Sequence, residues 1–203
     1  MIDLYTAATP NGRKIVFMLE ELGVPYKEHK VDLKSNQQKT PEFLAMNPNG
    51  RIPVIVDQKG PYDKQVTVFE SGAILYYLAE KYNTLFGHSL DEKAHVMEWV
   101  MFQMSGQGPN FGNYYFGKGM TPENPAYVQR FEKESQRLVG VMEMQLSKTD
   151  YFAGHNFTIA DIVLYPWTAA YLISKPEWFE SAPSVRRWAQ AIGQRPAAKK
   201  AMA

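Results

Sequence analysis

The hydrophobic periodicity of this 203-residue chain changes once, near residues 83–91. Before this region, short segments with strand-like composition alternate with segments of helical spacing; after it, apolar residues recur at helical spacing alone. The change predicts an α/β domain over residues 1–82, a linker over 83–91 and an all-helical domain over 92–203. At this length the chain can bury a hydrophobic core without disulfides or structural metals.

The first domain is expected to follow the order βαβ and then ββα. A helix between the first two strands predicts a right-handed crossover, so these strands should pair in parallel. A turn with Gly60 and Pro61 separates the last two strands, which should form a hairpin. The expected strands cover residues 2–5, 26–33, 52–57 and 65–69. The first expected helix follows the turn at residues 9–12 and is marked by Ile15, Met18, Leu19 and Leu22 before Gly23; the other two cover residues 41–46 and 71–82.

The second domain is expected to contain helices over residues 92–115, 125–146, 159–173 and 184–193. The third of these helices has the clearest N-terminal capping pattern. Thr158 fits the N-cap and Asp161 the third helical position, while Phe157 and Ile162 can form a hydrophobic staple. We interpret this pattern as a folding signal and not as part of a catalytic site.

The composition excludes several kinds of chemistry. The chain has no cysteine, so any sulfur chemistry must use a thiol that a ligand supplies. The 22 basic and 21 acidic side chains nearly cancel, which argues against nucleic acid as the main ligand. The four histidines lack metal-binding spacing, so no metal is expected. No secretory signal or membrane-length apolar segment is visible, and we expect a cytoplasmic protein.

The Ile52–Pro53 peptide bond is the first candidate for ligand binding. If this bond is cis, the resulting bend can leave the amide and carbonyl of Ile52 without hydrogen-bond partners in the sheet. These two groups could then hold a peptide in antiparallel register. In the commoner trans form, Pro53 would only start a strand.

A second candidate is Glu70–Ser71, at the start of an expected helix. The serine hydroxyl and the helix amides suit a carboxylate, and Glu70 could pair with an ammonium group. Together they would hold an amino-acid zwitterion. The alternative is a plain N-cap.

Thr9 and Asn11 lie in the turn before the first helix. Their hydroxyl and amide groups, with the positive helix end, could stabilise a bound thiolate; the alternative is an ordinary turn with an N-terminal proline. Tyr5 lies within a strand pattern and is interpreted as core. Arg130 and Arg137, seven residues apart on one helix, could meet a ligand carboxylate or form surface ion pairs.

These motifs, taken together, resemble the glutathione transferase superfamily over nearly the whole chain. The resemblance is carried by Tyr5 with Thr9-Pro-Asn-Gly, by Asn47-Pro-Asn-Gly-Arg-Ile-Pro53, by Phe69-Glu-Ser-Gly-Ala-Ile-Leu75 and by Thr158-Ile-Ala-Asp161. Thr9-Pro-Asn-Gly and the segment from Arg130 to Leu138 are similar to the nu class, the bacterial disulfide-bond oxidoreductases and their fungal nitrogen-regulator relatives. The resemblance implies a thioredoxin-like N-terminal domain and an all-α C-terminal domain.

The same resemblance implies the site residues. Pro53 would be cis, Ile52 would pair with the cysteinyl backbone of glutathione, and Glu70 and Ser71 would hold its γ-glutamyl end. Thr9 and Asn11 would contact the sulfur. The remaining glutathione-binding residues would be Gln38 at the glycyl end, Arg51 within the motif before Pro53, and Arg130 at a glutathione carboxylate, in a homodimer.

The expected activity is glutathione-dependent reduction of small disulfides. The sequence lacks the catalytic tyrosine, serine or cysteine placement of other transferase classes, yet thiol–disulfide exchange needs only the glutathione thiol. Two alternatives stay open: a general transferase that conjugates electrophiles, and a non-enzymatic glutathione-binding regulatory module.

Overall fold

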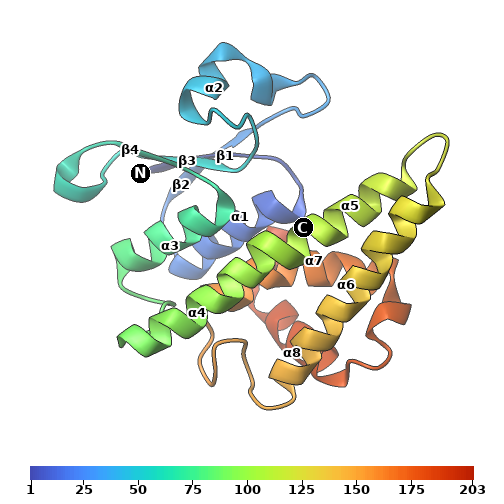
Figure 1. The fold of residues 1–203 in the computed structure, drawn as a ribbon. Helices are drawn as coiled ribbons and strands as arrows, with labels where there is room; N and C mark the ends of the chain where they lie inside the picture. The colour runs from blue at the N-terminus through green and yellow to red at the C-terminus, as the bar shows by residue number, and fades with distance from the viewer. The chain divides into compact units, whose positions relative to one another are not determined.

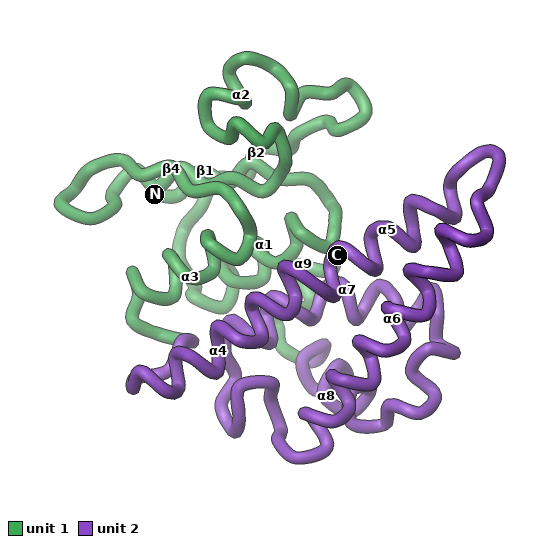
Figure 2. Tube along the Cα trace, viewed as in Figure 1, with its two compact units in different colours: residues 1–84, 195–203 green, residues 85–194 purple.

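The computed structural model describes residues 1–203 and divides into two compact units (Figure 2). Unit 1 comprises residues 1–84 and 195–203, and unit 2 comprises residues 85–194. The sequence pattern places residues 195–203 in the helical domain, whereas the structure groups them with unit 1. The reason is that α9 (Pro196–Met202) packs against α1 (Pro10–Leu22).

Unit 1 is built on a four-stranded sheet in the order β2-β1-β3-β4. Strand β1 pairs with β2 in parallel and with β3 in antiparallel orientation, and β3 pairs antiparallel with β4. This is the predicted thioredoxin-like arrangement. The strands are β1 (Ile2–Thr6), β2 (Tyr26–Lys30), β3 (Val54–Asp57) and β4 (Val66–Phe69).

Helices cover both faces of this sheet. Figure 1 shows α1 and α3 (Ser71–Tyr82) on one side and α2 (Pro41–Met46) on the other. Because both faces are covered, all four residues of β3 are buried, and its sequence is apolar except at Asp57. Short 3₁₀ helices occupy Gln37–Lys39 and Pro61–Asp63.

Two acidic residues of α1 form ion pairs with the α9 segment, which also buries Ala197, Ala198 and Ala201. Glu20 and Glu21 lie in the last turn of α1, near the negative end of the helix dipole, and α1 has no basic residue in that turn. Arg195 forms a bidentate ion pair with Glu21, and Lys200 Nζ lies 2.7 Å from the carboxylate of Glu20. The cations of the C-terminal segment therefore offset an unfavourable charge arrangement within α1.

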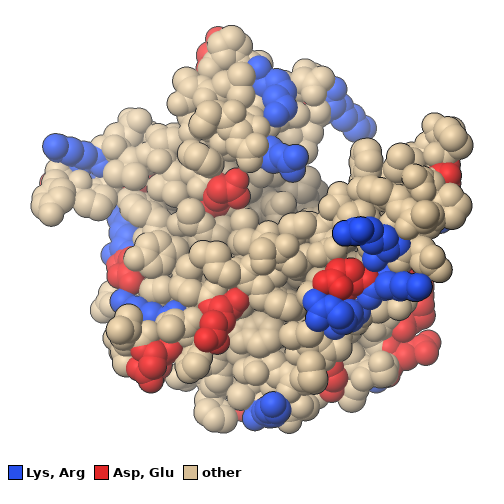
Figure 3. Space-filling model, in the orientation of Figure 1, with Lys and Arg blue, Asp and Glu red and all other residues tan.

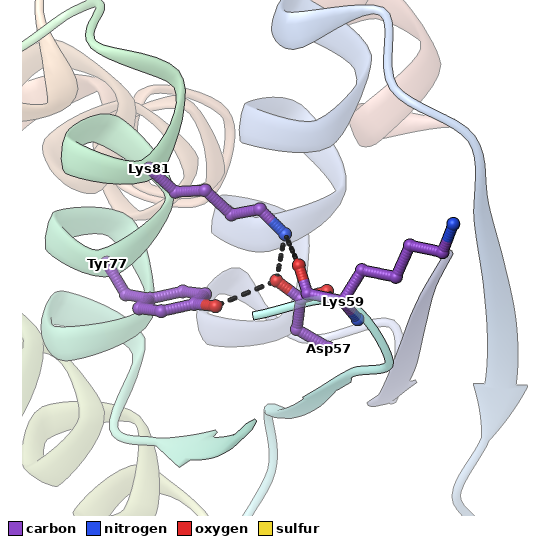
Figure 4. Close-up of polar contacts among 4 residues, drawn as sticks. All are labelled: Asp57, Lys59, Tyr77 and Lys81. Atoms are coloured by element: carbon purple, nitrogen blue, oxygen red, sulfur yellow. Dashed lines mark hydrogen bonds and ion pairs between the residues drawn. The ribbon is translucent and has the colours of Figure 1, made fainter. Parts of the chain in front are cut away.

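Asp57 is a buried carboxylate that ties the β3–β4 hairpin to α3 (Figure 4). It accepts hydrogen bonds from Lys81 Nζ, from Tyr77 Oη at 2.8 Å and from the Lys59 amide at 3.0 Å. Burial works to raise the pKa of Asp57, but these hydrogen bonds and the Lys81 charge outweigh it and hold the pKa below its usual value. The cluster lies at the end of β3 opposite Pro53 and has a structural role.

Unit 2 is helical throughout. The predicted helix over residues 92–115 is longer, because α4 (Leu90–Phe102) continues through a π-helical segment (Gln103–Gln107) into α5 (Gly108–Lys118). It starts within the expected linker, where Ser89 and Glu92 form a capping box. The others are α6 (Pro125–Leu146), α7 (Ile159–Ser174), a 3₁₀ turn (Pro176–Phe179) and α8 (Pro183–Gln194). None of the helices has the length and apolar character to span a membrane.

The start of α7 confirms the predicted capping box. Thr158 accepts a hydrogen bond from the Ala160 amide at 3.3 Å, and the Asp161 carboxylate accepts one from the Thr158 amide at 2.9 Å. Asp161 also accepts hydrogen bonds from Trp188 Nε1 at 2.8 Å and from the Phe152 amide at 3.2 Å. Burial nevertheless raises the pKa of Asp161 to about 6. One carboxylate thus joins three segments of unit 2.

Side chains of both charge signs are visible on the face drawn in Figure 3, with uncharged surface between many of them. Two ion pairs of unit 2 join Arg137 to Glu134 at 2.7 Å and Lys118 to Glu123 at 2.9 Å.

Replacing Asp161 with alanine should destabilise the protein by about 3 kcal/mol, because it leaves the buried Trp188 indole and two backbone amides without their acceptor. Chemical denaturation followed by circular dichroism measures the change. Asp150→Ala, at an exposed position, is the matched control and should change stability by less than about 0.5 kcal/mol. Equal stability of the two variants would contradict the role of Asp161.

Candidate functional site

Three chain segments meet at one end of the sheet in unit 1. Tyr5, near the end of β1, pairs with Val54 at the start of β3, and Val54 also pairs with Phe69 at the end of β4. The residues that follow β1, precede β3 and follow β4 therefore share one edge of the sheet. They include most of the residues that the sequence singles out: Thr9, Asn11, Arg51, Ile52, Pro53, Glu70 and Ser71.

Thr9 is the N-cap of α1. Its backbone is extended (φ −119°, ψ 159°), and its hydroxyl oxygen accepts a hydrogen bond from the Gly12 amide at 3.2 Å. Because the oxygen is the acceptor here, the hydroxyl proton can be donated to another group. Asn11 is the second residue of the helix, and both side chains are half-buried. The turn therefore offers donors beside the positive end of α1.

Gly12 allows the first turn of α1 to approach the preceding loop closely. A Cβ atom at this position would lie 2.2 Å from the Ala7 carbonyl oxygen and 2.3 Å from Thr6 Oγ1, one a backbone atom and the other a buried side chain. The constraint is steric and not conformational, because Gly12 lies within regular helix. Any side chain here must displace the turn that positions Thr9.

The loop before β3 is held by the buried side chain of Asn47. Its amide nitrogen donates to the Arg51 carbonyl at 2.7 Å, and its amide oxygen accepts from the Asn49 backbone at 2.9 Å. Gly50 completes the turn with a left-handed backbone (φ 59°) and donates to the Asn47 carbonyl at 2.9 Å. Asn47 belongs to the motif quoted for the family resemblance, but its positioning role is visible only in the structure.

The Ile52–Pro53 peptide bond is cis, as the resemblance implies. Ile52 lies outside β3, and neither its amide nor its carbonyl takes part in the backbone hydrogen bonds of the loops. Its side chain packs on a cluster formed by Val31, Phe43 and Val54. Ile52 is therefore anchored by its side chain while its main-chain groups stay available to an extended peptide.

Glu70 and Ser71 form the start of α3. Glu70 has φ 68° and ψ 118°, an uncommon backbone conformation for a non-glycine residue. Its carbonyl accepts the amide of Ile74 at 2.9 Å, and its exposed carboxylate accepts a hydrogen bond from Asn49 Nδ2 at 3.3 Å. Ser71 is only 3% exposed. A carboxylate and a hydroxyl thus lie at the N-terminal end of α3, the arrangement expected from the sequence for a zwitterion.

Lys14 adds a cation that the sequence interpretation missed. It lies on α1, is 1% exposed, and its Nζ donates to Ser71 Oγ at 3.2 Å. Burial lowers the pKa of Lys14 to about 7, although the charge of Glu70 works in the opposite direction. A signal exists in the sequence, because Phe17 and Met18, three and four residues further on, share the buried face of the helix.

Gln38 and Arg130 lie on other elements than these three segments, and Arg51 lies at the edge of the sheet with an exposed side chain. Gln38 lies in the 3₁₀ helix of unit 1, and its side-chain oxygen is buried without a hydrogen-bond partner, which marks an acceptor that a ligand can satisfy. The Arg51 side chain is exposed, and its carbonyl is held by Asn47. Arg130 lies at an exposed position of α6 in unit 2, and its contact with a glutathione carboxylate stays a prediction.

Comparison with known proteins agrees with this geometry. The N-terminal domain model of glutathione S-transferases matches residues 2–80, and the C-terminal domain model matches residues 94–196. The chain is 40% identical to the disulfide-bond oxidoreductase YfcG of Escherichia coli K12, over 100% of this chain and 94% of YfcG. It is 33% identical to the disulfide-bond oxidoreductase YghU of the same organism, over 98% of this chain and 73% of YghU.

Solved structures are similar over almost the whole chain. A glutathione transferase from Burkholderia graminis, with two glutathione molecules bound per subunit, has a TM-score of 0.94 at 40% identity and covers 99% of this chain and 87% of its own. A glutathione transferase from Pseudomonas putida, with one glutathione disulfide bound per subunit, has a TM-score of 0.91 at 34% identity. The match covers 99% of this chain and 90% of the Pseudomonas putida chain.

The fold and the site define a class: proteins with a thioredoxin-like unit, a cis-proline loop at the end of its sheet, and an all-helical unit. The family matches make the assignment specific, because together they span most of both units. The chain belongs to the glutathione S-transferase family.

Replacing Gly12 with alanine should weaken glutathione binding at least about tenfold, since the added methyl must displace the turn that carries Thr9 and Asn11. Isothermal titration calorimetry measures this. Gly140→Ala, also within a helix but with open space around the new Cβ, is the matched control and should leave the affinity unchanged. Normal affinity in a well-folded Gly12→Ala variant would show that the close approach does not shape the site.

Proposed function

We propose that the protein is a glutathione-dependent disulfide reductase. Two observations together carry this proposal. The backbone amide and carbonyl of Ile52 are left unpaired beside a cis-proline, where an extended peptide could bind, and the chain contains no cysteine. A thioredoxin-like site without its own thiol can perform thiol–disulfide exchange only when the bound ligand brings the sulfur. The relatives named as disulfide-bond oxidoreductases support the same chemistry.

Each part of glutathione has a counterpart at the edge of the sheet. The amide and carbonyl of Ile52 would pair with the cysteinyl backbone, as an added strand does. Ser71 and the first amides of α3 would hold the γ-glutamyl α-carboxylate, and Glu70 would pair with its ammonium group. Gln38 and Arg51 would serve the glycyl end, where the buried side-chain oxygen of Gln38 can accept the glycyl amide.

Thr9 and Asn11 would act on the sulfur. The Thr9 hydroxyl, oriented by the Gly12 amide, can donate to a thiolate, and Asn11 and the positive end of α1 add to the stabilisation. These groups lower the pKa of a bound thiol and so raise the fraction of thiolate at neutral pH. Their task is electrostatic, because neither side chain can itself exchange with a disulfide.

The reaction balances with two glutathione molecules for each disulfide. The first thiolate attacks one sulfur of the substrate, forming a mixed disulfide and releasing one substrate thiolate, which takes up a proton. A second glutathione thiolate attacks the glutathione sulfur of the mixed disulfide, giving glutathione disulfide and the second substrate thiol. The similar structure with two glutathione molecules per subunit holds the two thiols that the scheme consumes, and the one with glutathione disulfide holds the oxidised glutathione that it forms.

Two further expectations belong to the proposal. A homodimer would allow Arg130 to reach a glutathione carboxylate, as the family resemblance implies. A cytoplasmic location would supply the reduced glutathione that the reaction consumes.

Purified protein should reduce 2-hydroxyethyl disulfide with glutathione, measured as formation of glutathione disulfide through NADPH-coupled glutathione reductase. Combining Thr9→Ala with Asn11→Ala should lower kcat/KM by roughly a hundredfold, because preorganised donors to a developing anion contribute on this scale. Thr9→Ser keeps the hydroxyl and should retain most of the activity. An unchanged rate in the double variant would refute the assignment of these residues. Turnover restricted to an electrophilic aromatic acceptor would favour a conjugating transferase.

A further inference from the structure

The proposed functional groups leave one buried cation unexplained. Lys14 is 1% exposed, and its Nζ donates to Ser71 Oγ at 3.2 Å. A buried ammonium group costs free energy that an apolar side chain of similar length would avoid. The position therefore carries a charge where packing alone would favour methionine or leucine.

We propose that Lys14 is a positioning residue of the γ-glutamyl site, which orients the Ser71 hydroxyl and takes up a proton when the ligand carboxylate binds. The inference rests on the proposed binding of glutathione at the start of α3. It adds a specific consequence, namely that glutathione affinity depends on pH through a group that does not belong to glutathione.

The geometry supports a link between the two ends of the ligand. Lys14 lies three residues, just under one turn, beyond Asn11 on the helix that Thr9 caps, so α1 carries both the proposed sulfur donors and this cation. Ser71 is the first residue of α3, where the free amides already favour an anion. A carboxylate bound there would interact with the helix end, the serine hydroxyl and the Lys14 charge together.

Glu70 is the charged group that acts on Lys14, and its field favours the ammonium form. Among the other charged groups on α1 and α3, Arg13 directly precedes Lys14 in the sequence and Glu80 lies in the last turn of α3. Glu20 and Glu21 of α1 pair with Lys200 and Arg195 of the α9 segment, and Lys81 of α3 pairs with Asp57 of β3. A bound carboxylate would add its negative charge to that of Glu70 in the field that favours the ammonium form of Lys14.

The direction in which glutathione affinity changes with pH follows from the titration of Lys14. Burial lowers the pKa of Lys14 to about 7, so in the ligand-free protein a large fraction of the side chain is neutral near neutral pH. A bound carboxylate favours the ammonium form and raises this pKa. Affinity should then be highest below pH 7 and fall with rising pH, by up to about tenfold per pH unit, until the pKa of the complex is reached.

The stability of the ligand-free protein should show the opposite trend. The pKa of Lys14 is depressed from its ordinary value of 10.5 to about 7 on folding. Between these values the unfolded chain binds more protons than the folded chain, so the free energy of unfolding rises with pH. Lys14→Met removes the titrating group and should remove this part of the pH dependence.

The decisive measurement is titration calorimetry with S-methylglutathione, whose thiol cannot ionise, from pH 6.5 to 8.5 in two buffers of different ionisation enthalpy. The wild type should take up a fraction of a proton on binding near pH 7.5, and its Kd should rise with pH. Lys14→Met should bind roughly tenfold more weakly at pH 6.5, with no proton uptake and a flat pH profile. Lys59→Met removes an exposed lysine and should behave as the wild type.

The outcomes separate the two proposals. Binding of S-methylglutathione by the wild type without proton uptake would overturn the role of Lys14 while leaving glutathione binding intact. Uniformly weaker binding in Lys14→Met with proton uptake unchanged would reduce Lys14 to a structural residue and also overturn the role. Absence of any heat with glutathione itself would instead overturn the proposed function. If Lys14→Met does not fold, Lys14→Arg, which keeps a cation that does not titrate, should bind without proton uptake.

Discussion

The antiparallel pairing of β3 with both β1 and β4 is the constraint on which the site depends. It brings the start of one strand between the ends of two others, so that three loops distant in the sequence share one edge of the sheet. The cis bond at Pro53 and the outlying backbone of Glu70 both occur at this edge. The strands supply rigidity, and the loops leave main-chain groups unpaired where an extended peptide can use them.

Much of the fold follows from local patterns in the sequence. The alternation of strand and helix in unit 1, the uninterrupted helical spacing in unit 2 and the capping box at Thr158 and Asp161 were all predictable, because each depends on neighbouring residues. The attachment of residues 195–203 to unit 1 was not. It depends on ion pairs between Glu20 and Glu21 and residues about 175 positions later, and no local pattern encodes a partner at that separation.

Some residues of the candidate site were likewise predictable from local sequence, and others were not. Thr9, Ile52, Pro53, Glu70 and Ser71 were identifiable because each lies at a turn or a helix start, where residue type and backbone geometry are linked. Lys14 was missed because a lysine in a helix is ordinarily exposed, and only the packing of α1 on the start of α3 makes it buried. The positive φ of Glu70 was also unpredictable, since a non-glycine residue gives no sign that tertiary contacts will hold it there.

The packing of α9 in unit 1 affects the order in which the two units can fold during synthesis. A ribosome synthesises the sheet and the first three helices, then all of unit 2, and only afterwards the segment that neutralises the acidic end of α1. During synthesis unit 2 can fold as a continuous stretch of chain, while unit 1 must wait for its last helix. Unit 1 is therefore the first to begin and the last to be completed.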